Sequence, residues 1–216
     1  ARLFAQYPDV QLIIAHAGIA DLAGLAGRFG GKAGVFFDTS VWSPVDLLSF
    51  YHLVSPEQVL YASDYPYGRQ PSSLLNAIRT AKVAGFDEEQ LREMLAGNAN
   101  RIASGEPPLE PSPPTGDGTF KQSMPLARIH SYLSMATPLL WMNQADSIGI
   151  IGLALNAADE RDGYPEEIEQ IRELLTTARD LWRVFPEVEE EDLGDVARTT
   201  RGLIHIADIL AVTSNA

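Results

Sequence analysis

The sequence has no cysteine among its 216 residues. Disulfide bonds and thiolate metal sites are therefore excluded, and we expect a cytoplasmic protein. Long apolar runs are also missing, since none approaches the ~20 residues that a membrane-spanning helix needs, and we expect no signal peptide. Lysine and arginine are scarce relative to aspartate and glutamate, so the formal net charge is −13. This balance disfavours nucleic acid and anionic membranes as partners, because both bind clustered positive charge.

Proline and glycine are concentrated in one stretch of the chain, residues 104–124. Such a density favours an extended, polyproline-like linker over a packed element. We therefore predict two domains, residues 1–103 and 125–216, joined by this linker. With 45% hydrophobic residues, the chain has enough apolar surface for two small cores.

Three short apolar runs in the first domain each end at an ionisable side chain. These end residues are His16, Asp38 and Asp64, separated by 22 and 26 positions. Each interval leaves room for a helix and two loops, as a strand–helix unit of a parallel sheet requires. Side chains just beyond the carboxyl ends of parallel strands are the ones that meet ligands. The pattern predicts an α/β fold with three polar residues on one edge of the sheet.

Three segments, Tyr7–Gly18, Val59–Pro66 and Gly97–Ile102, resemble the last part of the metal-dependent amidohydrolase superfamily. The closest likeness is to the branch related to aminocarboxymuconate semialdehyde decarboxylase. This resemblance implies the C-terminal part of a (β/α)8 TIM barrel, with strands six and eight in the first two segments and strand seven in Gly34–Ser40. The chain would then lack the first five barrel strands.

The resemblance also implies a divalent metal ion, zinc or another, that activates water. Asp64 would bind this metal or take the proton from the water, and His16 would bind metal or substrate. In the family the first strand carries a His-x-His pair and the fifth strand another histidine. This sequence has four histidines, and no two are separated by a single residue. His16 and Asp64 alone are too few ligands, so we expect a second chain or a missing barrel half to complete the site.

Simpler interpretations exist for each of these side chains. His16 fits a core histidine bonded to a carbonyl group, and Asp64 fits a residue that caps a loop. Asp38 fits a hydrogen-bonding support better than a catalyst. Trp42 and Tyr65 fit either the lining of a pocket or ordinary packing.

The second domain has helical periodicity, with Pro138 as an expected kink, and reads as an acidic bundle of four amphipathic helices. From Pro125 onward it has 7 arginines, no lysine and 16 acidic residues, for a net charge of −9. In the first domain we predict Ser43 as a helix N-cap and Gly97 as the end of another helix.

Two functions fit these features. The first is part of a metal-dependent hydrolase or decarboxylase that acts on a small organic acid, amide or lactone. The second is a non-catalytic scaffold or regulatory subunit whose acidic helices bind a partner. Three parallel strands cannot close a barrel, so we expect the edge of the first strand to be covered by another chain, a second copy or further residues, which makes an oligomer the expected state.

Overall fold

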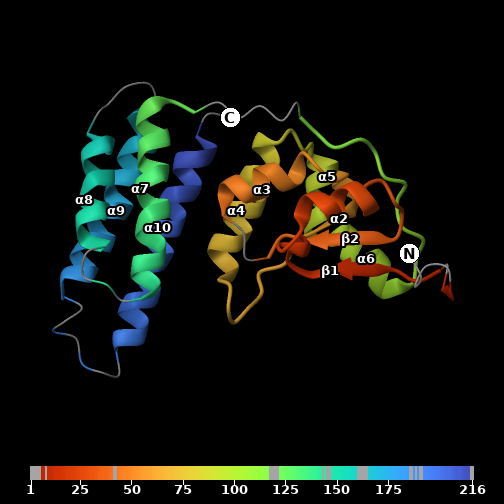
Figure 1. Cartoon of the computed structure of the whole chain (residues 1–216), viewed down its shortest axis with the longest axis horizontal. Coiled ribbons are helices and arrows are strands. Elements are labelled where there is room, and N and C mark those ends of the chain that lie inside the picture. Colours follow the sequence, from red (N-terminus) through yellow and green to blue (C-terminus); the bar gives the residue numbers. More distant parts are fainter. Residues whose placement is uncertain are drawn as a thin grey trace. The chain divides into compact units, whose positions relative to one another are not determined.

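The computed structural model describes residues 6–7, 9–40, 43–116, 122–142, 144, 147–159, 165–184, 187, 189 and 192–214. The chain divides into two compact units, Ala1–Thr119 and Phe120–Ala216 (Figure 1). The first unit contains strands and helices, whereas the described residues of the second unit contain no strand.

A parallel sheet of three strands lies at the centre of the first unit. The strands are β1 (Leu12–Ile14), β2 (Val35–Asp38) and β3 (Val59–Leu60), and they lie in chain order. Helix α2 (Leu22–Phe29) connects β1 to β2, and helix α3 (Pro44–Tyr51) connects β2 to β3. The predicted tandem strand–helix units are thus confirmed as a partial α/β fold, while a closed barrel stays a prediction.

Strand β2 is the buried centre of this sheet. Its Phe36 and Phe37 are fully buried, and the Phe37 ring lies 6.2 Å from that of Phe50 on α3. Phe50 in turn contacts Tyr51, with ring centroids 5.3 Å apart. Burial of each such aromatic side chain contributes about 2 kcal/mol or more. The Tyr51 hydroxyl is buried and donates to the Ala77 carbonyl, and burial raises its pKa above the ordinary tyrosine value.

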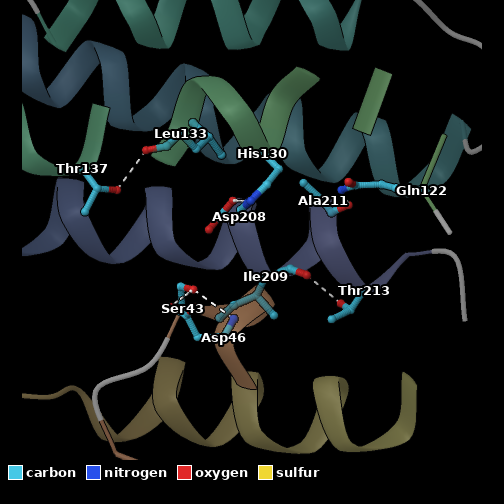
Figure 2. Close-up of polar contacts among 10 residues, drawn as sticks. All are labelled: Ser43, Asp46, Gln122, His130, Leu133, Thr137, Asp208, Ile209, Ala211 and Thr213. Carbon is cyan, nitrogen blue, oxygen red and sulfur yellow. Dashed lines mark hydrogen bonds and ion pairs between the residues drawn. The ribbon is translucent and has the colours of Figure 1, made fainter. Parts of the chain in front are cut away.

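The start of α3 is confirmed as predicted. Ser43 is the N-cap, and its side chain accepts a hydrogen bond of 3.2 Å from the Asp46 backbone N–H (Figure 2). Pro44 follows at the first turn, where a missing N–H costs nothing.

The prediction that a helix ends at Gly97 is wrong. The first unit continues through α4 (Gln70–Val83), α5 (Glu88–Arg92), the π-helical turn η3 (Glu93–Gly97) and α6 (Asn98–Ser104). Gly97 keeps helical dihedrals, and a Cβ there would lie 2.1 Å from the Glu93 carboxylate. Because Gly97 has no Cβ, the Glu93 carboxylate can lie close to its backbone. The helix ends instead at Gly105, which has a left-handed backbone conformation.

The outer edge of β3 is covered by this same helical segment. The Tyr61 N–H donates to the Met94 carbonyl at 2.9 Å, and the Asn98 side-chain amide donates to the Val59 carbonyl at 3.1 Å. Asn98 is 0% exposed. Backbone groups that would pair with a further strand on this side are therefore already bonded within the chain.

Strand β1 differs, because within the described residues it pairs with β2 alone. Its central Ile13 is 48% exposed, whereas the β2 residues opposite are buried. An apolar residue in the middle of a strand with one unpaired edge is the feature from which covering by another chain was predicted. That prediction is not tested by the structure.

The proline- and glycine-rich segment is fastened along the first unit up to Gly116. Ser112 donates to the Glu57 carboxylate from its backbone N–H at 3.0 Å and from its hydroxyl at 2.8 Å. His52, at the end of α3, donates from Nδ1 to the Thr115 carbonyl at 2.8 Å. These bonds give His52 a structural role and hold Ser112 and Thr115 against the first unit.

The described residues of the second unit form a bundle of four helices. Its helices are α7 (Met124–Trp141), α8 (Ser147–Ala158), α9 (Pro165–Val184) and α10 (Leu193–Thr213). Each packs against two neighbours, α7 with α8 and α10, and α9 with α8 and α10. The shared core includes Leu133, Ile151 and Ile171, all 0% exposed. None of the described helices is long and apolar enough to cross a membrane.

Polar contacts also join α7 to α10 (Figure 2). His130 Nδ1 lies 2.7 Å from Asp208 Oδ1, and both side chains are largely buried. Gln122 donates to the Ala211 carbonyl at 2.7 Å. His130 therefore has a structural role within the bundle.

Helix α7 continues through Pro138, so of the kink or break expected at this residue the break does not occur. Proline removes one helical hydrogen bond, to the carbonyl four residues earlier. That carbonyl belongs to Ser134, an exposed residue, so water can replace the missing donor. Leu133 and Leu140, on the buried side of the same helix, pack in the core and hold the helix in place.

We predict that Asn98→Asp opens the sheet edge. The substitution removes the donor to the Val59 carbonyl and places a buried carboxyl group there, at a cost of about 2–3 kcal/mol. Hydrogen exchange of peptides covering β2 and β3 measures this loss. Asn100→Asp, on the exposed side of α6, makes the same chemical change and should leave exchange within about 0.5 kcal/mol of wild type. Equal effects of the two variants would contradict the role assigned to Asn98.

Glu57 gives a pH-dependent prediction. Partial burial acts to raise the pKa of Glu57, but hydrogen bonds from Ser55 and Ser112 outweigh it, so this pKa lies below the ordinary value. Because its pKa is lower in the folded than in the unfolded chain, ionised Glu57 stabilises the fold at pH values above the ordinary glutamate pKa. This contribution is lost as the pH falls through the folded-state pKa.

Glu57→Gln should therefore reduce stability at neutral pH by no more than about 1 kcal/mol and converge with wild type at acid pH. Thermal unfolding of both proteins across this pH range measures the convergence. Glu110→Gln makes the same change at an exposed position of the proline- and glycine-rich stretch and is the control. A pH-independent difference between Glu57→Gln and wild type would contradict the assignment.

Candidate functional site

The three ionisable residues predicted to share an edge follow the carboxyl ends of the three strands. His16 lies in the 3-10 turn η1 (Ala15–Gly18) directly after β1. Asp38 is the last residue of β2, and Asp64 comes four positions after the end of β3. Because the strands are parallel, their carboxyl ends meet at one edge of the sheet.

Asp38 ties the end of β1 to the end of β2. Its Oδ1 accepts hydrogen bonds from the His16 backbone N–H at 2.9 Å and from the Ser40 backbone N–H at 3.0 Å. The Ser40 hydroxyl contacts the same oxygen. Asp38 is thus a hydrogen-bonding support, as the sequence suggested.

The imidazole of His16 is held by Ser40. His16 Nδ1 lies 2.8 Å from Ser40 Oγ, and Ser40 is only 2% exposed. Asp38 therefore fixes the backbone of His16 directly and its ring through Ser40.

Thr39 makes the corresponding connection between β2 and β3. Its backbone N–H donates to the Leu60 carbonyl at 2.9 Å, and its hydroxyl accepts from the Ala62 N–H at 3.2 Å. This bond holds the chain between Leu60 and Asp64 against the end of β2. The three strand ends are thus joined in series, by Asp38 and Ser40 on one side and by Thr39 on the other.

Left-handed backbone conformations occur at this edge. Among the described residues, the non-glycine residues with positive φ are His16 (53°), Ala17 (47°) and Asp64 (56°). Such conformations cost about 1 kcal/mol or more for residues with a Cβ, and they cluster at functional sites. Histidine and aspartate tolerate them better than alanine does. Both predicted site residues therefore occupy conformations that the surrounding structure must enforce.

Asp64 sits in a tight loop. The Gly68 N–H donates to the Asp64 carbonyl at 2.8 Å, and a Cβ on Gly68 would overlap the Ser63 carbonyl oxygen. Only glycine allows the loop to return so closely. The carboxylate of Asp64 is half-buried and makes no hydrogen bond or ion pair with the residues that the structure describes. Its side chain is available for a ligand.

Comparison with family models decides the family of this unit. Residues 1–102 match the model of the family described as Amidohydrolase. This part of the chain belongs to the amidohydrolase superfamily. A comparison with curated proteins found no match, and neither did one with solved structures.

Members of the amidohydrolase superfamily generally use divalent metal ions. The described residues of this chain do not fit such an ion by themselves, because no group of three His, Asp or Glu side chains is placed to hold one. His16 and Asp64 supply at most two ligands, the number that the sequence indicated. A resident metal would need ligands from outside the described residues.

The structure assigns no pocket-lining role to the two aromatic residues named from the sequence, Trp42 and Tyr65. Trp42 lies outside the described residues. Tyr65 is 74% exposed next to Asp64, so it is not packed within the unit. Sequence reasoning gave no role to Ser40 or Thr39. The signal was there, since Asp-Thr-Ser is a run of polar residues directly after a buried strand.

We predict that Asp64→Gly leaves the stability of this amidohydrolase unit unchanged or slightly raised. The side chain makes no internal bond, and glycine adopts positive φ without a steric cost. Asp64→Ala loses the same carboxylate but retains a Cβ, so it should be about 1 kcal/mol less stable than Asp64→Gly. Urea unfolding of the three proteins tests the order. A loss above about 1.5 kcal/mol in Asp64→Gly would show that the carboxylate is structural.

Proposed function

We propose that this chain is part of an amidohydrolase-like enzyme that hydrolyses or decarboxylates a small organic acid, amide or lactone. The observation that carries the proposal is the placement of His16 and Asp64. Both follow strand ends at one sheet edge, and both are held in left-handed backbone conformations. Sheet edges of this kind are the reacting faces of parallel α/β enzymes.

The two side chains have distinct roles in this proposal. Asp64 has a half-buried carboxylate without a partner among the residues that the structure describes, so it takes the proton from an attacking water or binds the ion that activates it. His16 is held at Nδ1 by Ser40, and in this proposal its imidazole binds metal or substrate. A bound metal would supply water activation, but the described residues do not hold one alone.

The remaining ligands come, in this proposal, from a second chain or from the other barrel half. The edge of β1 supports it, because that strand pairs only with β2 among the described residues and exposes Ile13. A strand added there would both cover Ile13 and bring further side chains to the same edge. The branch related to aminocarboxymuconate semialdehyde decarboxylase and a cytoplasmic location are part of the same proposal.

A second candidate is a non-catalytic scaffold or regulatory subunit. The observation in its favour is the absence of three metal-binding side chains in one place among the described residues. The acidic bundle would then bind a partner, since its net charge from Pro125 onward is −9.

The test is the composition and metal content of the native assembly. We expect a second polypeptide or a longer chain, with about one divalent metal ion per barrel, because catalytic sites of this type need at least three ligands. Asp64→Asn should remove the metal or lower it severalfold. Asp9→Asn, the same change at an exposed position, should leave the metal in place.

The opposite outcome is equally clear. If the 216-residue chain is isolated alone and without metal, the enzyme proposal fails for this molecule. Loss of metal in both variants would show general unfolding and give Asp64 no special role.

A further inference from the structure

Charge is distributed unevenly between the two halves of the helical bundle. Between Met124 and Ala158, the stretch that contains α7 and α8, the sequence has two charged residues, Arg128 and Asp146. From Asp159 to the end of the chain it has 21 charged residues, and their net charge is −9. Because α7 packs with α8 and α9 packs with α10, the bundle has an uncharged side, formed by the outer faces of α7 and α8, and an opposite, acidic side (Figure 1).

The half of the bundle that lacks charge also exposes large apolar side chains. The described residues of the second unit expose six such side chains, and five of them belong to this half: Met124, Met135, Trp141, Met142 and Leu153. The sixth is Val184, at the end of α9. A surface helix normally carries charged side chains on its outer face, and a helix that is apolar all round is typically covered. Helix α8 has no charged side chain along its 12 residues, so its outer face has the character of a covered surface.

The side chains on the outer face of α8 are small. This face is a stripe of four residues at helical spacing, Gly149, Gly152, Leu153 and Asn156. A Cβ at either glycine would meet nothing within 4 Å beyond its own helix. Each glycine costs about 1 kcal/mol of helix stability relative to alanine, and packing within the bundle gives no reason for either. A missing Cβ allows close approach of another backbone, so the two glycines point to a second molecule on this face.

Charge decides which molecule fits the uncharged side. A basic partner would bind the acidic side, because 15 of the 16 acidic residues of the bundle belong to its second half. The uncharged side fits a surface that is itself apolar and uncharged, and a second copy of this chain carries one. In a two-fold contact each patch faces its own equivalent, so it must be complementary to itself. A patch without like charges meets this condition in a chain whose net charge is −13, and the two acidic sides then point away from each other.

We propose that two copies of this chain associate through the uncharged side, with their α8 helices antiparallel across a two-fold axis near Gly152 and Leu153. These two residues are at the centre of the stripe, so each lies close to its equivalent in the other copy. Leu153 of one protomer then packs over the Gly152 backbone of its partner, and Gly149 faces Asn156. Met135 of α7 extends the apolar contact. This inference goes beyond the proposed function and does not depend on it, because it uses the second unit alone.

Sedimentation equilibrium of the full chain over a range of concentrations tests the contact. We expect a reversible dimer in the wild type. Leu153→Glu should raise the dissociation constant of this dimer at least about tenfold, because two carboxylates would face each other near the axis. Val184→Glu is the matched control, since Val184 is 47% exposed and Leu153 is 45% exposed, and the same change then falls on α9. The control should leave the dissociation constant unchanged.

The absence of cysteine from the chain allows a second, independent test. Leu153→Cys places a single thiol near the proposed axis, where it meets its equivalent in the other copy at a separation that a disulfide can bridge. Mild oxidation should convert this variant to a covalent dimer. Val184→Cys places an equally exposed thiol on the acidic side and should stay mainly monomeric under the same oxidation.

A wild-type chain that stays monomeric at every concentration would overturn the proposal, and this result does not depend on any variant. A dimer that survives Leu153→Glu, or that Val184→Glu weakens equally, would place the contact on another surface and overturn it as well. Failure here is distinguishable from failure of the proposed function. The metal content of the native assembly reports on the enzyme, whereas the mass and the cross-linking of these α8 and α9 variants report on the contact between copies.

Discussion

One carboxylate oxygen, Oδ1 of Asp38, organises the edge of the sheet where the candidate site lies. It accepts from the backbone of the turn after β1, from the backbone after β2 and from the Ser40 hydroxyl. Without this acceptor, two backbone N–H groups would lose a partner in a partly buried place, at a cost of about 1–3 kcal/mol each. The left-handed conformation of His16 is stable because this oxygen holds its N–H.

The two edge strands of the sheet, β1 and β3, differ in how far other residues of the first unit bond to their outer sides. The β3 edge is bonded to the segment around Met94 and Asn98, so it offers few backbone groups to a further strand. At β1 the described residues provide no such cover, and Ile13 stays half-exposed. Any completion of the fold by added strands would therefore begin at β1, next to His16, and new side chains would arrive beside the imidazole.

Much of this architecture could be predicted from local sequence patterns. Apolar runs ending at His16, Asp38 and Asp64 identified the strands and their order, because a buried parallel strand is nearly continuous in apolar residues. The Ser43 cap followed from a short-range rule. Gly97 was misjudged because glycine there allows an approach by Glu93, which no helix-ending rule considers. The hydrogen bond between His16 and Ser40 and the bond from Ser112 to Glu57 each join residues far apart in the sequence, so no local pattern predicts them.

The polar series at the strand ends also bears on the choice between catalyst and scaffold. The Ser40 hydroxyl is buried and the Asp38 carboxylate and His16 imidazole are partly buried, so these groups lose much of their hydration. Their mutual hydrogen bonds compensate for this loss only in part. Well-packed apolar side chains of similar volume at the same positions often give equal or greater stability. A scaffold needs Asp38 to join the two strand ends, but it gains little from the contact of an imidazole with Ser40. An enzyme gains an imidazole whose position is fixed by a hydrogen bond, which is the kind of preorganisation that catalysis requires.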